Sequence, residues 1–167
     1  MDNLIDFFIE AGKLKGIERT GWVVEGVKNP ESVADHSFRT ALAVLVLGDR
    51  RKEIDLFKAV KMALIHDIAE SRIGDILVGW KVKLHGEKMK RLGSKGGHGI
   101  TQEEKLRKER EAMKQIVSFL GDSGKEFLAL WEEFEAGLTK EAVFVKSVEN
   151  FEMLLQSFEY KRTQKID

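Results

Sequence analysis

Two histidines and an aspartate are the residues of this 167-residue sequence best suited to chemistry. His36 and His66 stand thirty positions apart, and His66 is followed at once by Asp67 inside an apolar stretch. A charged pair in such surroundings loses hydration, so it is kept mainly where a metal or another partner compensates. Imidazole and carboxylate ligands together suit Zn²⁺, Mn²⁺, Co²⁺, Fe²⁺ or Ni²⁺. The pattern therefore predicts a metal site.

Two helices must hold these side chains. Ser32 followed by Asp35 resembles a capping box, which predicts a helix over about 33–47 with His36 in its first turn. The second half of that helix is apolar on every side, which indicates a central position. Asp55 predicts the N-cap of the next helix.

A groove between those two helices can bring the candidate ligands together. His66 falls near the end of the second helix, and an antiparallel pair with a short connector can place it opposite His36. Neighbouring residues on a helix diverge by about 100°, so His66 and Asp67 must approach an ion from two flanks. A fourth protein ligand has to come from elsewhere, and the last predicted helix supplies Glu149.

Helical periodicity recurs along the rest of the chain. Thr101 and Glu104 form a second capping box, and Gly121 is a plausible end for the helix that they open. The segment 17–30, with Gly21 and Gly26, is interpreted as an irregular connector. Further helices are expected over about 4–14, 124–136 and 139–160. No strand pattern is convincing, so we predict a single all-α domain over 1–167, a bundle of five or six main helices.

The composition excludes several classes of partner. Twenty-eight basic and twenty-eight acidic residues cancel, so no global field draws the chain to a nucleic acid polymer or a membrane. The longest apolar run has seven residues, far short of a membrane span. Cysteine is absent, which excludes thiolate metal ligands and fits a reducing compartment. With no signal-type stretch at the N-terminus, we expect a cytoplasmic protein.

A structural interpretation competes with the metal site. His36 could simply occupy the start of a helix, and His66 could be a hydrogen-bonded core histidine. For either histidine alone this interpretation is favoured, since short motifs match by chance. Taken jointly with Asp67, Glu70 and Asp75, the metal site is favoured.

The order of these motifs resembles that of the HD-domain metal-dependent phosphohydrolases, which are named for the His-Asp pair. The amino-acid sequence is similar to that of the 5′-deoxynucleotidase branch of this family over nearly the whole chain. The matching stretches are Arg19-Thr20-Gly21-Trp22, Asn29-Pro30-Glu31-Ser32-Val33-Ala34-Asp35-His36, His66-Asp67-Ile68-Ala69-Glu70, Gly74-Asp75-Ile76, Glu111-Ala112-Met113-Lys114-Gln115-Ile116, Phe144-Val145-Lys146 and Glu152-Met153-Leu154-Leu155-Gln156.

The resemblance implies a role for each matching residue. The metal ligands would be His36, His66 and Asp67, the catalytic carboxylate Glu70, the acid orienting water or substrate Asp75, and the phosphate-binding arginine Arg19. It also implies a divalent ion, with Co²⁺, Mn²⁺ and Zn²⁺ foremost, and a homodimer. The expected reaction removes the 5′-phosphate from (deoxy)nucleoside monophosphates. Trp22 would stack on base or sugar, or else be a buried anchor, which is the more frequent outcome for tryptophan.

The sequence departs from the family pattern at Glu149. The family has a ligand aspartate where this chain reads Ser147-Val148-Glu149. Glutamate keeps the carboxylate but extends it by roughly 1.5 Å, the length of one carbon–carbon bond. Glu149 could therefore bind directly, bind through water, or turn away.

A second departure is the segment 79–99, which is rich in glycine and lysine. It is interpreted either as a solvated loop, which is favoured, or as a loop that closes over phosphate. His85 and His98 within it are expected to be incidental rather than ligands.

Two other functions remain open from the sequence. The nearer is an HD phosphohydrolase that acts on another phosphoester, such as a cyclic nucleotide. The further is a catalytically weakened protein that binds a nucleotide without hydrolysing it, a possibility raised by Glu149.

Overall fold

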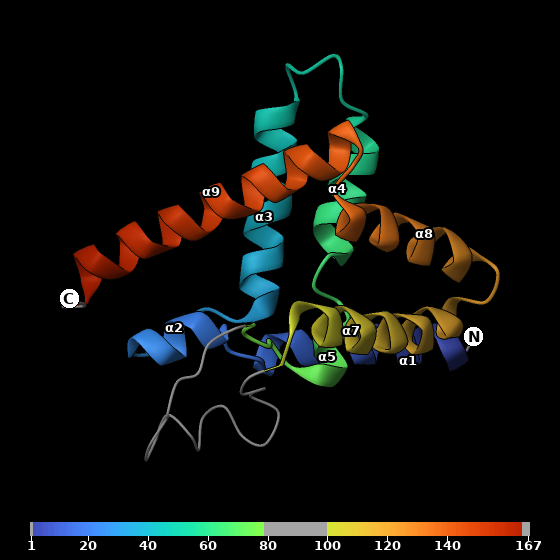
Figure 1. Ribbon diagram of the computed structural model, residues 1–167, viewed down its shortest axis with the longest axis horizontal. Coiled ribbons are helices and arrows are strands. Elements are labelled where there is room, and N and C mark those ends of the chain that lie inside the picture. The colour runs from blue at the N-terminus through green and yellow to red at the C-terminus, as the bar shows by residue number, and fades with distance from the viewer. Residues whose placement is uncertain (1, 79–99, 165–167) are drawn as a thin grey trace.

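The computed structural model describes residues 2–78 and 100–164, and this part of the chain is helical with no β-strand (Figure 1). The predicted all-α class is therefore confirmed. Six of the described helices have at least ten residues: α1 (Asp2–Gly12), α3 (Val33–Gly48), α4 (Leu56–Ile65), α7 (Gln102–Val117), α8 (Ser123–Ala136) and α9 (Lys140–Thr163). Shorter elements are η1 (Lys13–Gly16), α2 (Thr20–Glu25), α5 (Glu70–Ile73) and η3 (Ser118–Leu120).

The helix starts follow the predicted capping chemistry. Ser32 accepts a hydrogen bond from the backbone of Asp35, and the Asp35 side chain accepts one from the backbone of Ser32. Thr101 and Glu104 form the same reciprocal pair at α7. Asp55 caps α4 by accepting from the Lys58 amide. These side chains satisfy backbone donors that have no partner within the helix.

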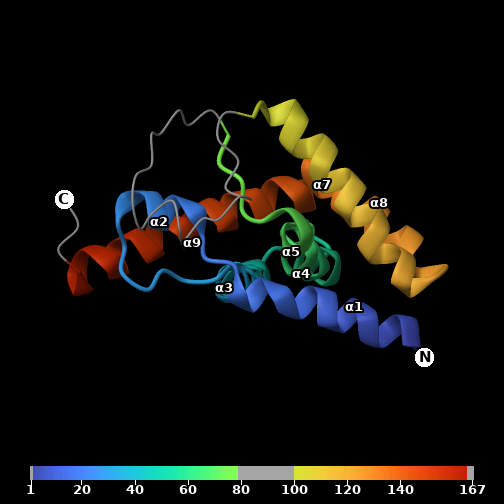
Figure 2. The same cartoon turned by 90° about the horizontal axis from the view of Figure 1, so that it is seen from below.

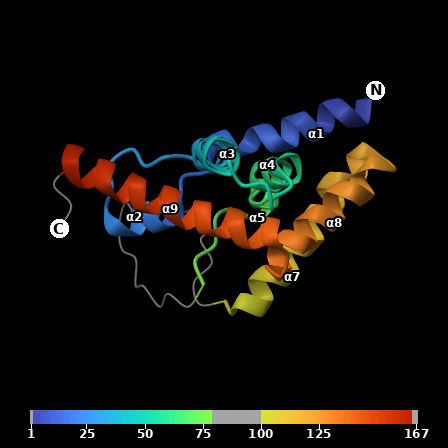
Figure 3. The same ribbon diagram turned by 90° about the horizontal axis from the view of Figure 1, so that it is seen from above.

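The helices α3 and α4 form a central antiparallel hairpin, and α9 packs against both of them. Figure 3 looks along this hairpin and shows α9 crossing beside it. At the lower end, α5 lies between α1 and α7 (Figure 2). The hydrophobic core lies between these helices. Its fully buried members include Trp131, Met62, Met113, Ile116, Val44 and Val145.

Two predictions about the elements were wrong. The predicted connector 17–30 contains the helix α2, which ends where Gly26 adopts φ 85° and the Val27 amide bonds back to the Trp22 carbonyl. Gly26 thus terminates a helix, as glycine commonly does, rather than excluding one. The helix α3 is central on one side only, because Phe38, Leu42 and other apolar residues on its outer side are exposed.

The Gly-rich segment 79–99, with His85 and His98, lies outside the described residues, so the predictions for it stay untested. None of the described helices is long and apolar enough to span a membrane.

Candidate metal centre

The side chains of His36, His66 and Asp67 converge at the lower end of the α3–α4 hairpin. His36 lies in the first turn of α3, and His66 is the residue that ends α4. One ligand atom from each of the three residues lies within 4.8 Å of the other two. Both imidazoles are buried, and the Asp67 side chain is 15% exposed. The structure therefore brings together three of the four predicted ligands.

The distances between the ligand atoms suit a single ion. His36 Nε2 lies 3.4 Å from His66 Nε2, and Asp67 Oδ2 lies 3.2 Å and 3.7 Å from the nitrogens of His66 and His36. An ion with bonds of about 2.1 Å separates neighbouring ligands by about 3.0 Å in an octahedron and about 3.4 Å in a tetrahedron. The triangle of ligand atoms fits either geometry, so the residues present are suited to a divalent ion.

The other ring nitrogen of each histidine is already hydrogen-bonded. His66 Nδ1 lies 2.8 Å from the Ala63 carbonyl oxygen, which can only accept, so this nitrogen donates. His36 Nδ1 lies 2.6 Å from Glu152 Oε2, and both side chains are completely buried. The two Nε2 atoms face each other at 3.4 Å.

The fourth predicted ligand, Glu149, lies near this group without joining it. It is half-buried on α9, and its charge raises the pKa of both His66 and Arg19. Among the described residues, the close group of ligand atoms comprises His36, His66 and Asp67 only. Glu149 therefore acts on this group through its charge, and its coordination of an ion stays a prediction.

Charge coupling between His66 and Asp67 favours their ionised forms in the protein without metal. Burial opposes charge on the His66 imidazole, but the adjacent Asp67 outweighs it and raises the pKa of His66 to about 9. Burial likewise opposes ionisation of Asp67, yet the charge of His66, followed by that of Arg19, lowers the pKa of that carboxyl well below its ordinary range. The Asp67 carboxylate is thus available as an anionic ligand.

Arg19 and Asp75 border the candidate metal centre on one side. Arg19 Nη1 lies 3.4 Å from Asp67 Oδ2 and 3.7 Å from Asp75 Oδ2. The chain reaches Asp75 through Gly74, whose φ of 78° and ψ of 168° are accessible essentially to glycine alone. Asp75 then accepts from the Thr20 amide and hydroxyl, through its side chain at 2.8 Å and its carbonyl at 2.6 Å.

Glu70 presents a buried carboxylate from the first turn of α5. Burial first, and then the charges of Asp67 and Asp75, raise the pKa of Glu70 well above its ordinary value. Neither carboxylate oxygen accepts a hydrogen bond within the described part of the chain. The Lys105 ammonium on α7 lies 3.8 Å from Glu70 and 3.2 Å from Glu109. A buried carboxylate without hydrogen-bond donors is costly, which points to a functional use.

A pocket of about 220 Å³ opens beside Arg19 and Asp75. The Trp22 indole lines it while donating to Glu31 at 3.0 Å and packing edge-on against Tyr160. Trp22 is therefore both an anchored side chain and a pocket wall. The remaining lining residues are Gly21, Glu25, Leu77 and Met153.

Two participants, Glu152 and Lys105, received no role from the sequence. The spacing that could have revealed Glu152 is a run at intervals of four on α9, all buried: Val148, Glu152, Gln156 and Tyr160. A glutamate within such a run must lie in the core and requires a partner. Lys105 stands in a strongly charged stretch and has no comparable signal.

Comparisons with known proteins agree with this geometry. The family model described as HD domain matches residues 11–167. A curated relative from Dictyostelium discoideum, named 5′-deoxynucleotidase HDDC2, is 41% identical over 169 residues, covering 97% of this chain and 80% of that protein. A solved conserved hypothetical protein from Pyrococcus furiosus has a TM-score of 0.71 at 35% identity, with 95% of this chain and 82% of that chain covered. A predicted metal-dependent phosphohydrolase from Magnetospirillum magnetotacticum has a TM-score of 0.67 at 27% identity, with 95% and 70% covered.

Proposed function

Because the chain belongs to the HD-domain family, we propose that it is a metal-dependent phosphohydrolase that removes the 5′-phosphate from (deoxy)nucleoside monophosphates. The observation that carries this proposal is the convergence of the His36, His66 and Asp67 ligand atoms beside Arg19 and the buried Glu70 carboxylate, which accepts no hydrogen bond from the described residues. The 5′-deoxynucleotidase name of the relative supplies the substrate class.

His36, His66 and Asp67 are the proposed protein ligands of the metal, with Glu149 as the fourth. A bound divalent ion would lower the pKa of a coordinated water and offset the negative charge of the phosphate. Nitrogen and oxygen ligands of this kind suit Co²⁺, Mn²⁺ and Zn²⁺. Imidazole must be neutral to bind, so metal uptake releases the proton that His66 carries.

Arg19 is proposed to hold the phosphate oxygens. The charges of Asp75 and Asp67 outweigh the effect of burial and raise the pKa of Arg19, so its guanidinium stays charged. Its side chain is only 13% exposed and is held from both sides, which limits its freedom before substrate arrives. A fixed planar fork can donate to two phosphate oxygens at once.

Glu70 is proposed to take a proton from the attacking water and to return one to the leaving oxygen. Its raised pKa brings it closer to neutrality, where a general acid–base group works best. Neither of its oxygens accepts a hydrogen bond from the described residues, so both can accept one from a water or a substrate. Asp75 is proposed to orient that water or the substrate. Two hydrogen bonds from Thr20 fix the position of Asp75.

The pocket lined by Trp22, Leu77 and Met153 is proposed to receive the nucleoside. It borders Arg19 and Asp75, so a phosphate held at Arg19 would extend its sugar in this direction. Its wall is mainly apolar with an indole, which suits a sugar or a base face.

A substrate panel tests this reaction against the nearer alternative. We expect metal-loaded protein to release phosphate from dAMP and dTMP faster than from AMP or an aryl phosphate. Hydrolysis of a cyclic nucleotide, with none of the monophosphates, would identify a different HD phosphohydrolase.

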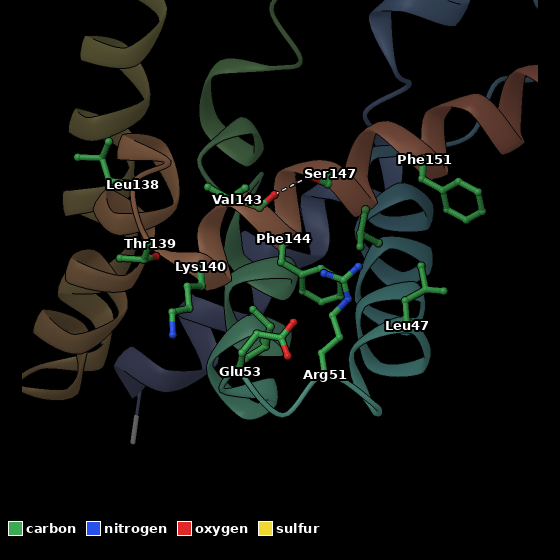
Figure 4. Close-up of a pocket in the computed structure, with 12 residues that line it drawn as sticks. Leu47, Arg51, Glu53, Leu138, Thr139, Lys140, Val143, Phe144, Ser147 and Phe151 are labelled. Carbon is green, nitrogen blue, oxygen red and sulfur yellow. Dashed lines mark hydrogen bonds between the residues drawn. The ribbon is translucent and has the colours of Figure 1, made fainter.

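A homodimer is proposed on an exposed apolar surface, which we call the α3–α9 face. Phe38 on α3 and Phe158 on α9 each leave 68% of their surface exposed, and the helices pack against each other. Leu47 of α3 and Phe151 of α9 both line a pocket of about 650 Å³ (Figure 4). Monomeric proteins rarely expose large contiguous apolar patches, so a group of exposed apolar residues on two packed helices supports contact with a second copy of the chain. The members of the face are Phe38, Leu42, Leu45, Val46, Phe151, Leu154, Leu155 and Phe158.

A single domain, a cytoplasmic location and the absence of membrane or nucleic acid polymer partners complete the proposal. The single domain rests on the length of 167 residues, the location on the lack of cysteine, and the absence of such partners on the balanced charge.

A further inference from the structure

Glu152 lies at the centre of a buried network that the proposed reaction does not use. Its Oε2 atom receives His36 Nδ1 at 2.6 Å, and its Oε1 atom receives Arg39 Nε at 2.7 Å. Its side chain has no exposed surface. A buried carboxylate is expensive to desolvate, so each of its oxygens must be satisfied, and here each one is.

Arg39 fixes the position of Glu152. Its guanidinium also binds Glu159 at 2.7 Å and Gln156, and it lies 3.7 Å from Glu31. These contacts join α3 to α9, because Glu152, Gln156 and Glu159 belong to α9 and Arg39 belongs to α3. Glu152 can therefore hold the His36 ring in one orientation.

The hydrogen bond sets which nitrogen of His36 is free. A carboxylate already paired with an arginine accepts hydrogen bonds, so His36 Nδ1 is the nitrogen that carries the proton. The lone pair then lies on Nε2, which points to the neighbouring Nε2 of His66 at 3.4 Å.

We propose that Glu152 is a positioning residue for the metal, holding His36 in the tautomer and orientation that present Nε2 to the ion. The inference rests on the proposed metal site and goes beyond it by naming a residue that does not touch the ion. Carboxylates that orient a metal-binding histidine change metal affinity by about 10–100-fold when replaced.

A competing interpretation is that Glu152 binds a metal directly, because ligand atoms of Glu31, His36 and Glu152 also lie within 4.8 Å of one another. The distances argue against it. Two ligands of one ion lie about 3.0 Å or more apart, whereas His36 Nδ1 and Glu152 Oε2 are 2.6 Å apart. The Glu31 Oε1 atom is also engaged, by the Trp22 indole.

The test measures Co²⁺ affinity by competition with a chelator, together with the visible spectrum of the saturated protein. Glu152→Gln should raise the Kd for Co²⁺ by about 10–100-fold and alter the spectrum. Glu159→Gln is the matched control, because it removes a carboxylate that binds the same Arg39 without touching His36. Its Kd should stay within about twofold of the wild type.

A conservative variant covers the case in which Glu152→Gln does not fold. Glu152→Asp keeps the charge beside Arg39 but withdraws the oxygen from His36, so its Kd should also rise. In the Zn²⁺-loaded wild type, a ¹H–¹⁵N spectrum of the imidazole nitrogens should show His36 protonated at Nδ1. Wild-type Co²⁺ affinity in a folded Glu152 variant, or protonation at Nε2, would overturn the inference while leaving the proposed hydrolase intact. Wild-type protein that binds no metal would refute both.

Discussion

The Nε2 atoms of His36 and His66 lie 3.4 Å apart although thirty residues separate them in the chain. This closeness follows from the α3–α4 hairpin, which places the first turn of one helix beside the end of the other. Each imidazole is turned to this arrangement by a hydrogen bond at its Nδ1 atom. The pair therefore forms one side of the proposed metal-binding triangle.

Replacing Glu70 by glutamine should separate catalysis from metal binding. The variant keeps the shape of the side chain but cannot accept a proton, so turnover should fall by at least about 100-fold. The Kd for Co²⁺ should change by only a few-fold, because Glu70 lies outside the close group of ligand atoms. Single-turnover phosphate release and a metal titration on the same preparation check both statements. Retained turnover would remove Glu70 from the proton-transfer role.

How far the sequence predicted this site depends on how locally each residue is determined. The convergence of His36, His66 and Asp67 could be predicted because capping residues fix where the two helices begin and a short connector makes them antiparallel. The helix α2 could not, since it spans only six residues and Gly26 was interpreted as a break. Glu152 was missed because its partners are distant, with Arg39 lying 113 positions earlier in the chain.

Glu149 illustrates a different limit. The sequence places it where the family has an aspartate, but whether its longer side chain reaches the ion depends on how α9 is rotated against α3. In the structure the charge of Glu149 raises the pKa of His66 and the pKa of Arg19. The exposed side of α3 was likewise hidden, because an apolar stretch does not tell whether it faces the core or the surface.

Two substitutions at Glu149 test its role as the fourth ligand. Glu149→Gln should weaken Co²⁺ binding at least about tenfold, whereas Glu149→Asp should bind at least as tightly as the wild type, since it restores the family residue. Glu135→Gln is the control, because Glu135 acts on Asp67 through its charge and has no proposed place among the ligands. Equal losses in Glu149→Gln and Glu135→Gln would mean that Glu149 contributes only charge.

The pH dependence of stability should carry a contribution from Glu109. Burial, which Lys105 offsets only in part, raises the pKa of Glu109 from 4.5 to about 7. The folded state thus holds the proton more tightly than the unfolded chain. The contribution is present below about pH 4.5 and is lost as the pH rises towards 7.

Glu109→Gln cannot ionise, so it does not lose this contribution as the pH rises. The Tm of the variant minus the Tm of the wild type should therefore become more positive between pH 4.5 and 7.5. A change on the order of 2 kcal/mol corresponds to about 4–8 °C in a protein of this size. Melting curves of metal-free protein across this range provide the measurement, with the exposed Glu126→Gln as the control. A constant difference across the range would show that Glu109 ionises alike in both states.

The α3–α9 face should determine the oligomeric state. Light scattering should give the wild type a mass of two 19.0 kDa chains at micromolar concentration. Phe158→Glu places a charge on the apolar surface and should yield monomers. Phe8→Glu, which alters an equally exposed phenylalanine on α1, should remain dimeric. A monomeric wild type, or a dimeric Phe158→Glu, would contradict this assignment.

The most direct test of the central claim is phosphate release from dAMP by metal-stripped protein that is re-supplied in turn with Co²⁺, Mn²⁺, Zn²⁺ and Mg²⁺. We predict no release without metal, and restoration near one equivalent of a transition metal in the wild type. His66→Ala, which removes one corner of the triangle, should stay inactive at the same metal concentration. Equal release with and without metal would contradict the account, and so would silence from folded protein that has bound each ion.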